Sequence, residues 1–186
     1  MKSIYNAMRA GLFAASCLFM AGLGLGILAA PAAHADQPTP LVVLAAKKIG
    51  IQACLPAITQ VAYKYTAGAT DQDITLDWNR KAPNSAPFFS MTAMSHGTEH
   101  AVLSITAIPL DRHGCALMVQ RVFSSTDSCS LIAQRDLSAY VGGRLIDGVL
   151  VYSDPSHPQS NYTLVQNSNN CAVIFRTDIP RWSPPG

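Results

Sequence analysis

The chain has 186 residues, and its 13 basic and 11 acidic side chains give a formal net charge of +2. Both basic residues in the first 35 positions, Lys2 and Arg9, belong to a segment that we expect to be removed, so residues 36–186 carry eleven charges of each sign. A neutral domain offers no electrostatic reason to expect nucleic acid as a partner. Its length is that of a single domain with a substantial core.

The first 35 residues have the pattern of a cleavable signal peptide. Lys2 and Arg9 form a positive start, residues 11–33 are uncharged and almost wholly apolar or small, and Ala33-His34-Ala35 is an A-x-A cleavage site. The apolar run is also long enough for an uncleaved membrane anchor, although its glycines and Pro31 favour cleavage. We therefore predict a secreted or periplasmic protein that has no membrane segment after cleavage.

Four cysteines follow the predicted cleavage site, an even number that predicts two disulfides in an oxidising compartment. Of the three possible connectivities we favour Cys115–Cys129, which closes locally around one strand, together with Cys54–Cys171. A zinc site made of all four cysteines is disfavoured because no C-x-x-C pair occurs.

The first part of the predicted domain has the periodicity of helices. Residues 41–50 follow a roughly helical spacing after Thr39-Pro40. Residues 55–66 place Leu55, Ile58, Val61 and Tyr65 on one helical face, and Gly68 stands where a helix end is expected. The sequence leaves open whether these are two helices or one kinked helix.

After Gly68 the periodicity changes to that of strands. We expect strands over 74–78, 88–94, 100–110 and 115–124, with a turn at 111–114, and then a short helix over 129–140 that ends at Gly142-Gly143. The rest predicts a strand over 145–152, a polar loop over 153–161, and strands over 162–166 and 171–178. The predicted fold is α+β: one or two N-terminal helices on an antiparallel sheet of five to seven strands, with a short inserted helix.

One short motif suggests metal chemistry. His96-Gly97-Thr98-Glu99-His100 matches H-x-x-E-H, in which two helical histidines bind zinc and the glutamate acts as a base. The surrounding residues alternate as strands do, so a solvated hairpin loop is the favoured interpretation, and His96, Glu99 and His100 are retained only as candidate metal ligands. Asp71, Asp73 and Asp77 lack the order of a calcium loop and are expected to be loop and strand-face aspartates.

The polar, proline-containing loop predicted over 153–161 is a candidate binding element, because a stiff loop loses little entropy on binding. Its candidate contact residues are Asp154, Ser156 and His157. No recognisable catalytic set occurs, and no cofactor is predicted. The leading hypothesis is an exported, non-enzymatic binding or accessory domain, such as an inhibitor or immunity-type protein, with a protein partner in the envelope or extracellular space. The alternatives are a metal-dependent hydrolase that uses the H-x-x-E-H motif and a secreted effector whose site is assembled from distant residues.

Overall fold

A computed structural model describes residues 38–110 and 114–183. The predicted signal peptide and most of the predicted turn at 111–114 lie outside these residues. The described chain is mostly β, with three helices and one antiparallel sheet of eight strands. The predicted α+β fold with five to seven strands is therefore wrong.

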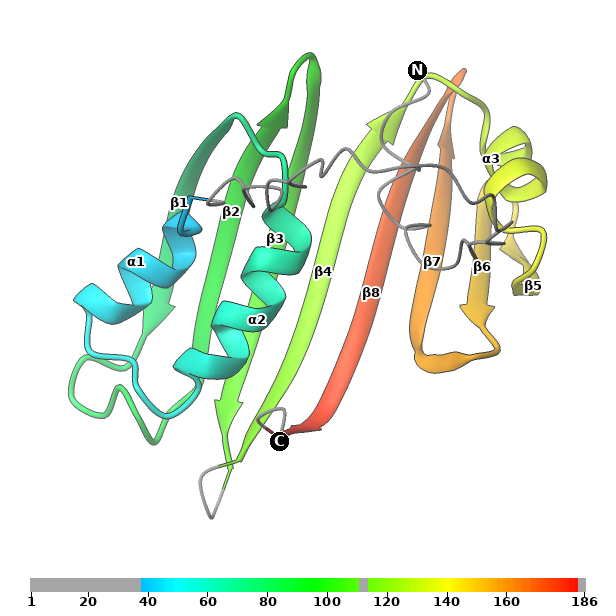
Figure 1. Ribbon diagram of the computed structural model, residues 1–186. Helices are drawn as coiled ribbons and strands as arrows, with labels where there is room; N and C mark the ends of the chain where they lie inside the picture. Colours follow the sequence, from blue (N-terminus) through cyan, green and yellow to red (C-terminus); the bar gives the residue numbers. More distant parts are fainter. Residues whose placement is uncertain (1–37, 111–113, 184–186) are drawn as a thin grey trace, which may run out of the picture. The chain divides into compact units, whose positions relative to one another are not determined.

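The eight strands follow one another as two antiparallel meanders that meet in the middle of the sheet (Figure 1). The spatial order is β1-β2-β3-β4-β8-β7-β6-β5. The strands are β1 (Asp71–Trp78), β2 (Phe88–His96), β3 (Glu99–Pro109), β4 (Cys115–Ser125), β5 (Val141–Ile146), β6 (Val149–Asp154), β7 (His157–Asn167) and β8 (Asn170–Trp182).

β5 was not predicted, because the β5–β6 hairpin replaces the single strand expected over 145–152. Asp147 and Gly148 form a two-residue turn between β5 and β6, and Gly148 has a φ of 76°, a left-handed conformation that favours glycine. The predicted loop over 153–161 is likewise a hairpin. Asp154 pairs with His157, so the polar residues that follow belong to β7.

All three helices pack on one face of the sheet. They are α1 (Leu41–Lys48), α2 (Leu55–Thr66) and α3 (Cys129–Asp136), so the first two are separate helices and the third ends four residues earlier than predicted. Figure 1 shows α1 and α2 lying across the first meander. The register places Leu117 and Val119 of β4 on the same face as Val173 of β8, and these residues lie under α2 and α3 respectively.

Two apolar cores lie between the helices and this face. The larger one joins α1 and α2 to β2, β3 and β4, and its fully buried side chains include Ile58, Phe88, Leu103 and Ile105. The smaller core joins α3 to β7 and β8 through Ile132, Leu164 and Val173. Aromatic rings bridge the two cores in a row of Tyr65, Phe175, Tyr162 and Tyr140, whose successive centroids are 5.7, 5.0 and 5.5 Å apart.

The four cysteines of the described residues form two disulfides, as predicted, but with a different connectivity. The bonds are Cys54–Cys115 and Cys129–Cys171. The predicted Cys115–Cys129 pair is wrong because the whole of β4 separates the two residues. An 11-residue strand spans about 35 Å, whereas the Cα atoms of a disulfide lie about 5 Å apart. Each bond instead fastens the start of one helix to the start of one of the two central strands.

Candidate functional site

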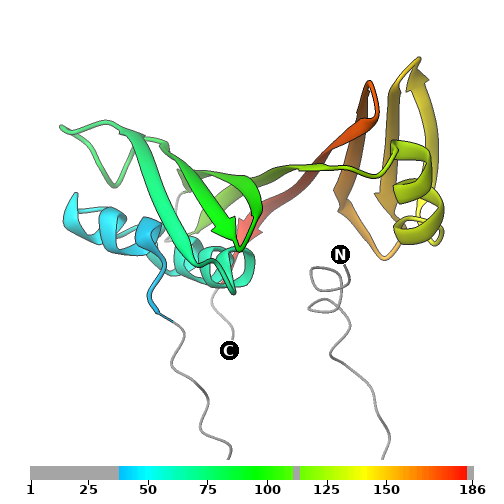
Figure 2. The ribbon, with the colours of Figure 1, turned by 90° about the horizontal axis from the view of Figure 1, so that it is seen from above.

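The face of β1–β4 opposite α1 and α2 carries no helix in the described part of the chain (Figure 2). We call this surface the open face. Because side chains alternate along a strand, every second residue of β1–β4 points to it. The register aligns these residues in rows across the four strands. The two rows nearest the β2–β3 turn differ in chemistry from the rows at the other end of the strands.

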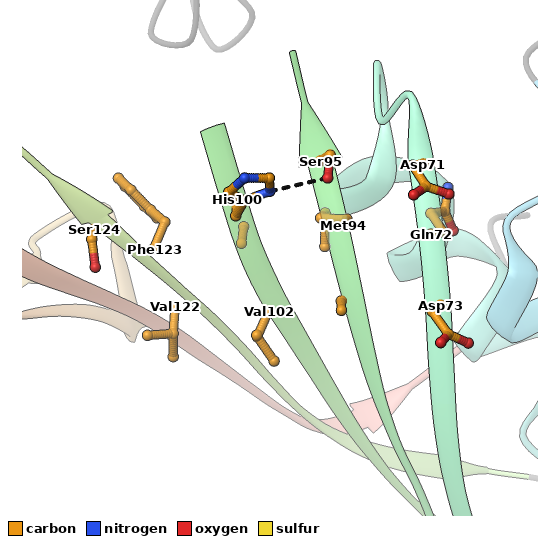
Figure 3. A pocket seen from close by; sticks show the side chains of 12 residues that line it. Asp71, Gln72, Asp73, Met94, Ser95, His100, Val102, Val122, Phe123 and Ser124 are labelled. Atoms are coloured by element: carbon orange, nitrogen blue, oxygen red, sulfur yellow. Dashed lines mark hydrogen bonds between the residues drawn. The ribbon is translucent and has the colours of Figure 1, made fainter. Parts of the chain in front are cut away.

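The first row of the open face is polar. Asp71 of β1 pairs with Ser95 of β2, Ser95 pairs with His100 of β3, and Ser124 of β4 lines the same hollow. The next row runs from Asp73 through Ala93 and Val102 to Val122. These two rows line an open hollow of about 460 Å³. Asp71 and Asp73 of β1 lie at one side of the hollow, and His100 comes from β3 (Figure 3).

One polar contact within the hollow is well defined. Ser95 Oγ and His100 Nδ1 lie 3.1 Å apart, within hydrogen-bond distance. In a serine–histidine–aspartate relay the imidazole lies between the hydroxyl and the carboxylate. Here the order across the strands is Asp71, Ser95, His100, which places the hydroxyl in the middle. Asp71, Ser95 and His100 therefore do not form such a relay.

Four large apolar side chains, which we call the apolar patch, lie in the other rows of the open face among the polar residues Thr75, Ser104, Thr106 and Gln120. Phe89 and Met91 of β2, Ile108 of β3 and Met118 of β4 are each between 37 and 43 % exposed, although strands normally bury side chains of this size. Phe89 and Met118 share one row with Thr106 between them, and Met91 occupies the neighbouring row. The patch and the hollow are parts of one continuous surface.

The charge of this surface is one-sided. Asp71, Asp73 and Asp77 all point to the open face from β1, as expected for strand-face aspartates. None of the open-face positions of the fully described strands β1–β3 is a lysine or arginine. Farther across the sheet, Arg176 of β8 is paired with Asp178 at 2.8 Å. The edge of the surface formed by β1 is therefore acidic.

The candidate metal ligands lie on the hairpin between β2 and β3, not on a helix. Gly97 and Thr98 form its turn, and His96 pairs with Glu99. His96 contacts the carbonyl oxygen of Ala67 at 3.3 Å on the helix-bearing side, while His100 points to the open face beside Ser95. The structure therefore does not bring the two imidazoles together. Among the described residues, no group of three or more metal-ligating side chains is placed to hold an ion.

The candidate binding residues of the predicted loop lie at the tip of the hairpin between β6 and β7. The carboxylate of Asp154 accepts a hydrogen bond from the backbone N–H of Ser156 at 2.8 Å, and it lies 2.9 Å from Nδ1 of His157. The contact with His157, followed by the bond from Ser156, lowers the pKa of Asp154 below its usual value. The three residues thus form a compact turn, distant in the strand order from the open-face hollow.

Comparison with protein-family models, with curated proteins and with solved structures finds no match for this chain. Within the described ranges, no helix combines the length and apolar character needed to cross a membrane. The two disulfides are typical of an oxidising environment.

The open face was not predicted as a site from the sequence. The signal was present in residues 88–94 and 100–110, where large apolar residues occupy both alternating sets, as in a strand covered on two sides. Here one of the two sides is uncovered in the described structure. The hollow had no comparable signal, because Asp71, Ser95 and His100 meet only through the pairing of three strands.

Proposed function

We propose that the chain is an exported, disulfide-stabilised binding protein that recognises a protein partner through the open face of β1–β4. The A-x-A pattern at residues 33–35 and the two disulfides support export to the periplasm or the extracellular space. The protein acts by binding, as an accessory or inhibitory domain, and not by turning over a substrate.

The observation that carries this proposal is the apolar patch beside the acidic hollow. Several large apolar side chains exposed on one face, here interspersed with Ser104, Thr106 and Gln120, are a feature of interaction sites. Phe89 and Met91 of β2 and Met118 of β4 project from a rigid sheet, so little entropy is lost when a partner covers them. Aromatic and methionine side chains are also enriched in protein interfaces.

The charges on the open face indicate the chemistry of the partner. Asp71, Asp73 and Asp77 form an acidic edge, and a partner surface with lysine or arginine around an apolar centre is complementary to it. The hollow, which Asp71, Asp73, Ser95 and His100 help to line, can take a single cationic side chain of the partner.

A pair of synthetic peptides tests this chemistry. One is a short amphipathic peptide of leucine and lysine, and the other has glutamate in place of lysine. Titration followed by NMR is expected to show at least about tenfold tighter binding of the lysine peptide, with the largest shifts on the open face of β1–β4. The preference should decrease at high salt.

Two matched variants complete this experiment. The triple change Asp71→Asn, Asp73→Asn, Asp77→Asn is expected to remove the preference for the lysine peptide. Leu44→Asp, at an exposed position of α1, should leave binding unchanged. Equal binding of both peptides to the wild type, or shifts centred on α1 and α2, would contradict the proposal.

A further inference from the structure

On the helix-covered side of the first meander, the outer surface is formed by α1, α2 and the loop over residues 79–87 (Figure 1). We call it the helix surface. The side chain of Asn84 fastens the loop to the α1–α2 connection. It accepts hydrogen bonds from the backbone N–H groups of Gln52 and Ala53 at 2.6 and 3.0 Å, and it donates one to the carbonyl oxygen of Gly50 at 3.1 Å. The loop therefore lies beside the end of α1.

The charge of the helix surface is opposite to that of the open face. Residues 38–70, which include both helices, contain three lysines and no aspartate or glutamate. The loop over 79–87 adds one arginine and one lysine, again with no acidic residue. The five cations are all exposed, and they are Lys47, Lys48, Lys64, Arg80 and Lys81. The helix surface is therefore basic, whereas the β1 edge of the open face is acidic.

Stabilisation of the helices explains only part of this charge bias. Lys47 and Lys48 lie in the last turn of α1, and Lys64 lies in the last turn of α2, where cations complement the helix dipole. An acidic residue in the first turn would stabilise each helix in the same way, yet neither helix has one. Arg80 and Lys81 belong to no helix. The bias is thus a property of the surface as a whole.

The cations of the helix surface also lack acidic partners, unlike three arginines farther along the chain. Arg135, Arg144 and Arg176 each form an ion pair with an aspartate, at 2.9, 2.7 and 2.8 Å. None of the five cations of the helix surface has an ion pair among the described residues. Their charge is therefore available to an anionic partner.

A large apolar side chain is exposed beside these charges. Leu44 is 50 % exposed, more than any other large apolar side chain of the described helices, and it lies one turn before Lys47 and Lys48. Lysines around an exposed apolar side chain are typical of helices that lie on anionic membranes. An acidic protein would attract the same cations, but the exposure of Leu44 favours a lipid surface, which takes up apolar side chains.

We propose that the helix surface binds peripherally to a membrane that contains anionic phospholipids, with Leu44 at the level of the headgroups. The five cations contact the lipid phosphates. The open face lies on the other side of the sheet, so it points away from the lipid and stays free for its protein partner.

Flotation with lipid vesicles tests this binding. The disulfide-bonded protein is collected after export, and mass spectrometry confirms that residues 1–35 are absent. Vesicles with about 30 % phosphatidylglycerol in phosphatidylcholine are expected to bind it at least about tenfold more tightly than pure phosphatidylcholine does. This difference should be largely lost in about 0.5 M salt.

Matched variants show whether the helix surface is responsible. Lys48→Gln with Lys81→Gln should weaken binding to the anionic vesicles at least about tenfold. The control, Arg144→Gln with Arg176→Gln, removes the same charge elsewhere and should change the affinity less than about twofold. Leu44→Ser keeps the net charge and should weaken binding at least about threefold. Circular dichroism of each variant confirms that the fold is retained.

Three outcomes would overturn the proposal. The first is equal binding to both kinds of vesicle, and the second is an equal loss of binding in the two double variants. The third is tight binding to soluble polyglutamate with no effect of Leu44→Ser, because an acidic polypeptide would then be the partner. None of these outcomes bears on peptide binding by the open face, so the two proposals can fail independently.

Discussion

Two buried hydroxyl groups in the larger core lack a hydrogen-bond partner among the described residues. They belong to Ser90 and Thr92 of β2, both 0 % exposed, on the face that α1 and α2 cover. Taking a hydroxyl out of water without a compensating bond costs about 1–3 kcal/mol, judged from mutations in other proteins. The cost of burying each hydroxyl therefore offsets part of the stability that the apolar atoms of the same side chain contribute.

Thr92→Val replaces the buried hydroxyl of Thr92 with a methyl group of similar shape. We expect the free energy of unfolding to rise by about 1 kcal/mol, since no hydrogen bond within the described core is lost. Urea denaturation of the oxidised protein measures this. The matched control is Thr75→Val, an exposed residue of β1, for which a change within about 0.5 kcal/mol is expected. A destabilised Thr92→Val would show that the hydroxyl has a partner in the folded protein.

The turn at Asp154 gives a prediction about pH. Its lowered pKa means that the folded state binds this proton less readily than the unfolded state does. The resulting stability is present above the usual aspartate pKa and is lost as pH falls through the lower, folded value. Asp154→Asn should therefore lose less stability than the wild type between neutral pH and pH of about 3. Urea midpoints of both proteins, measured across this pH range, test the prediction. Parallel pH profiles would contradict the stabilising role of the Asp154 carboxylate.

At the scale of elements, each disulfide attaches one helix to one central strand. Cys54–Cys115 ties α2 to β4, and Cys129–Cys171 ties α3 to β8, with sequence separations of 61 and 42 residues. Closing loops of these lengths stabilises a fold by about 4 kcal/mol each in the chain-entropy model. The smaller core depends more on its bond, because fewer buried side chains hold α3 in place.

Removing the second disulfide should loosen α3 without unfolding α1 and α2. The double change Cys129→Ala and Cys171→Ala is expected to cost up to about 4 kcal/mol of unfolding free energy. Amide exchange should quicken first in α3 and β7, which share the smaller core. The corresponding variant Cys54→Ala, Cys115→Ala is the comparison, and it should affect α2 first. A uniform increase of amide exchange in both variants would show that the two cores do not unfold separately.

Local sequence patterns predicted the elements whose periodicity is strong. The helix at 55–66 and the strands near 88–94, 100–110 and 115–124 are close to the observed bounds. The errors arose where a tight turn decides the structure. Asp147-Gly148 turns the chain within an apolar run, and Pro155-Ser156 turns it within a polar one, so composition alone suggested one strand and one loop.

At the scale of the whole molecule, the described residues bury only one face of the first meander. The helices cover the face with Leu103 and Ile105, while the alternate residues Val102 and Ile108 lie on the open face. Both alternating sets of residues contain apolar side chains in the sequence, so the sequence could not show which set is left uncovered by the helices. The acidic hollow was less predictable still, because its side chains come from strands whose register depends on the hairpins.

Site-specific photo-crosslinking in the cells that express the chain tests the central claim, that the open face binds a protein partner. A photoreactive phenylalanine analogue replaces Met91 on the open face or, as a control, Leu44 on α1, since both positions are similarly exposed. The account predicts a discrete crosslinked protein with a basic, apolar surface from position 91 and none from position 44. No crosslink from position 91, or the same products from both positions, would contradict it.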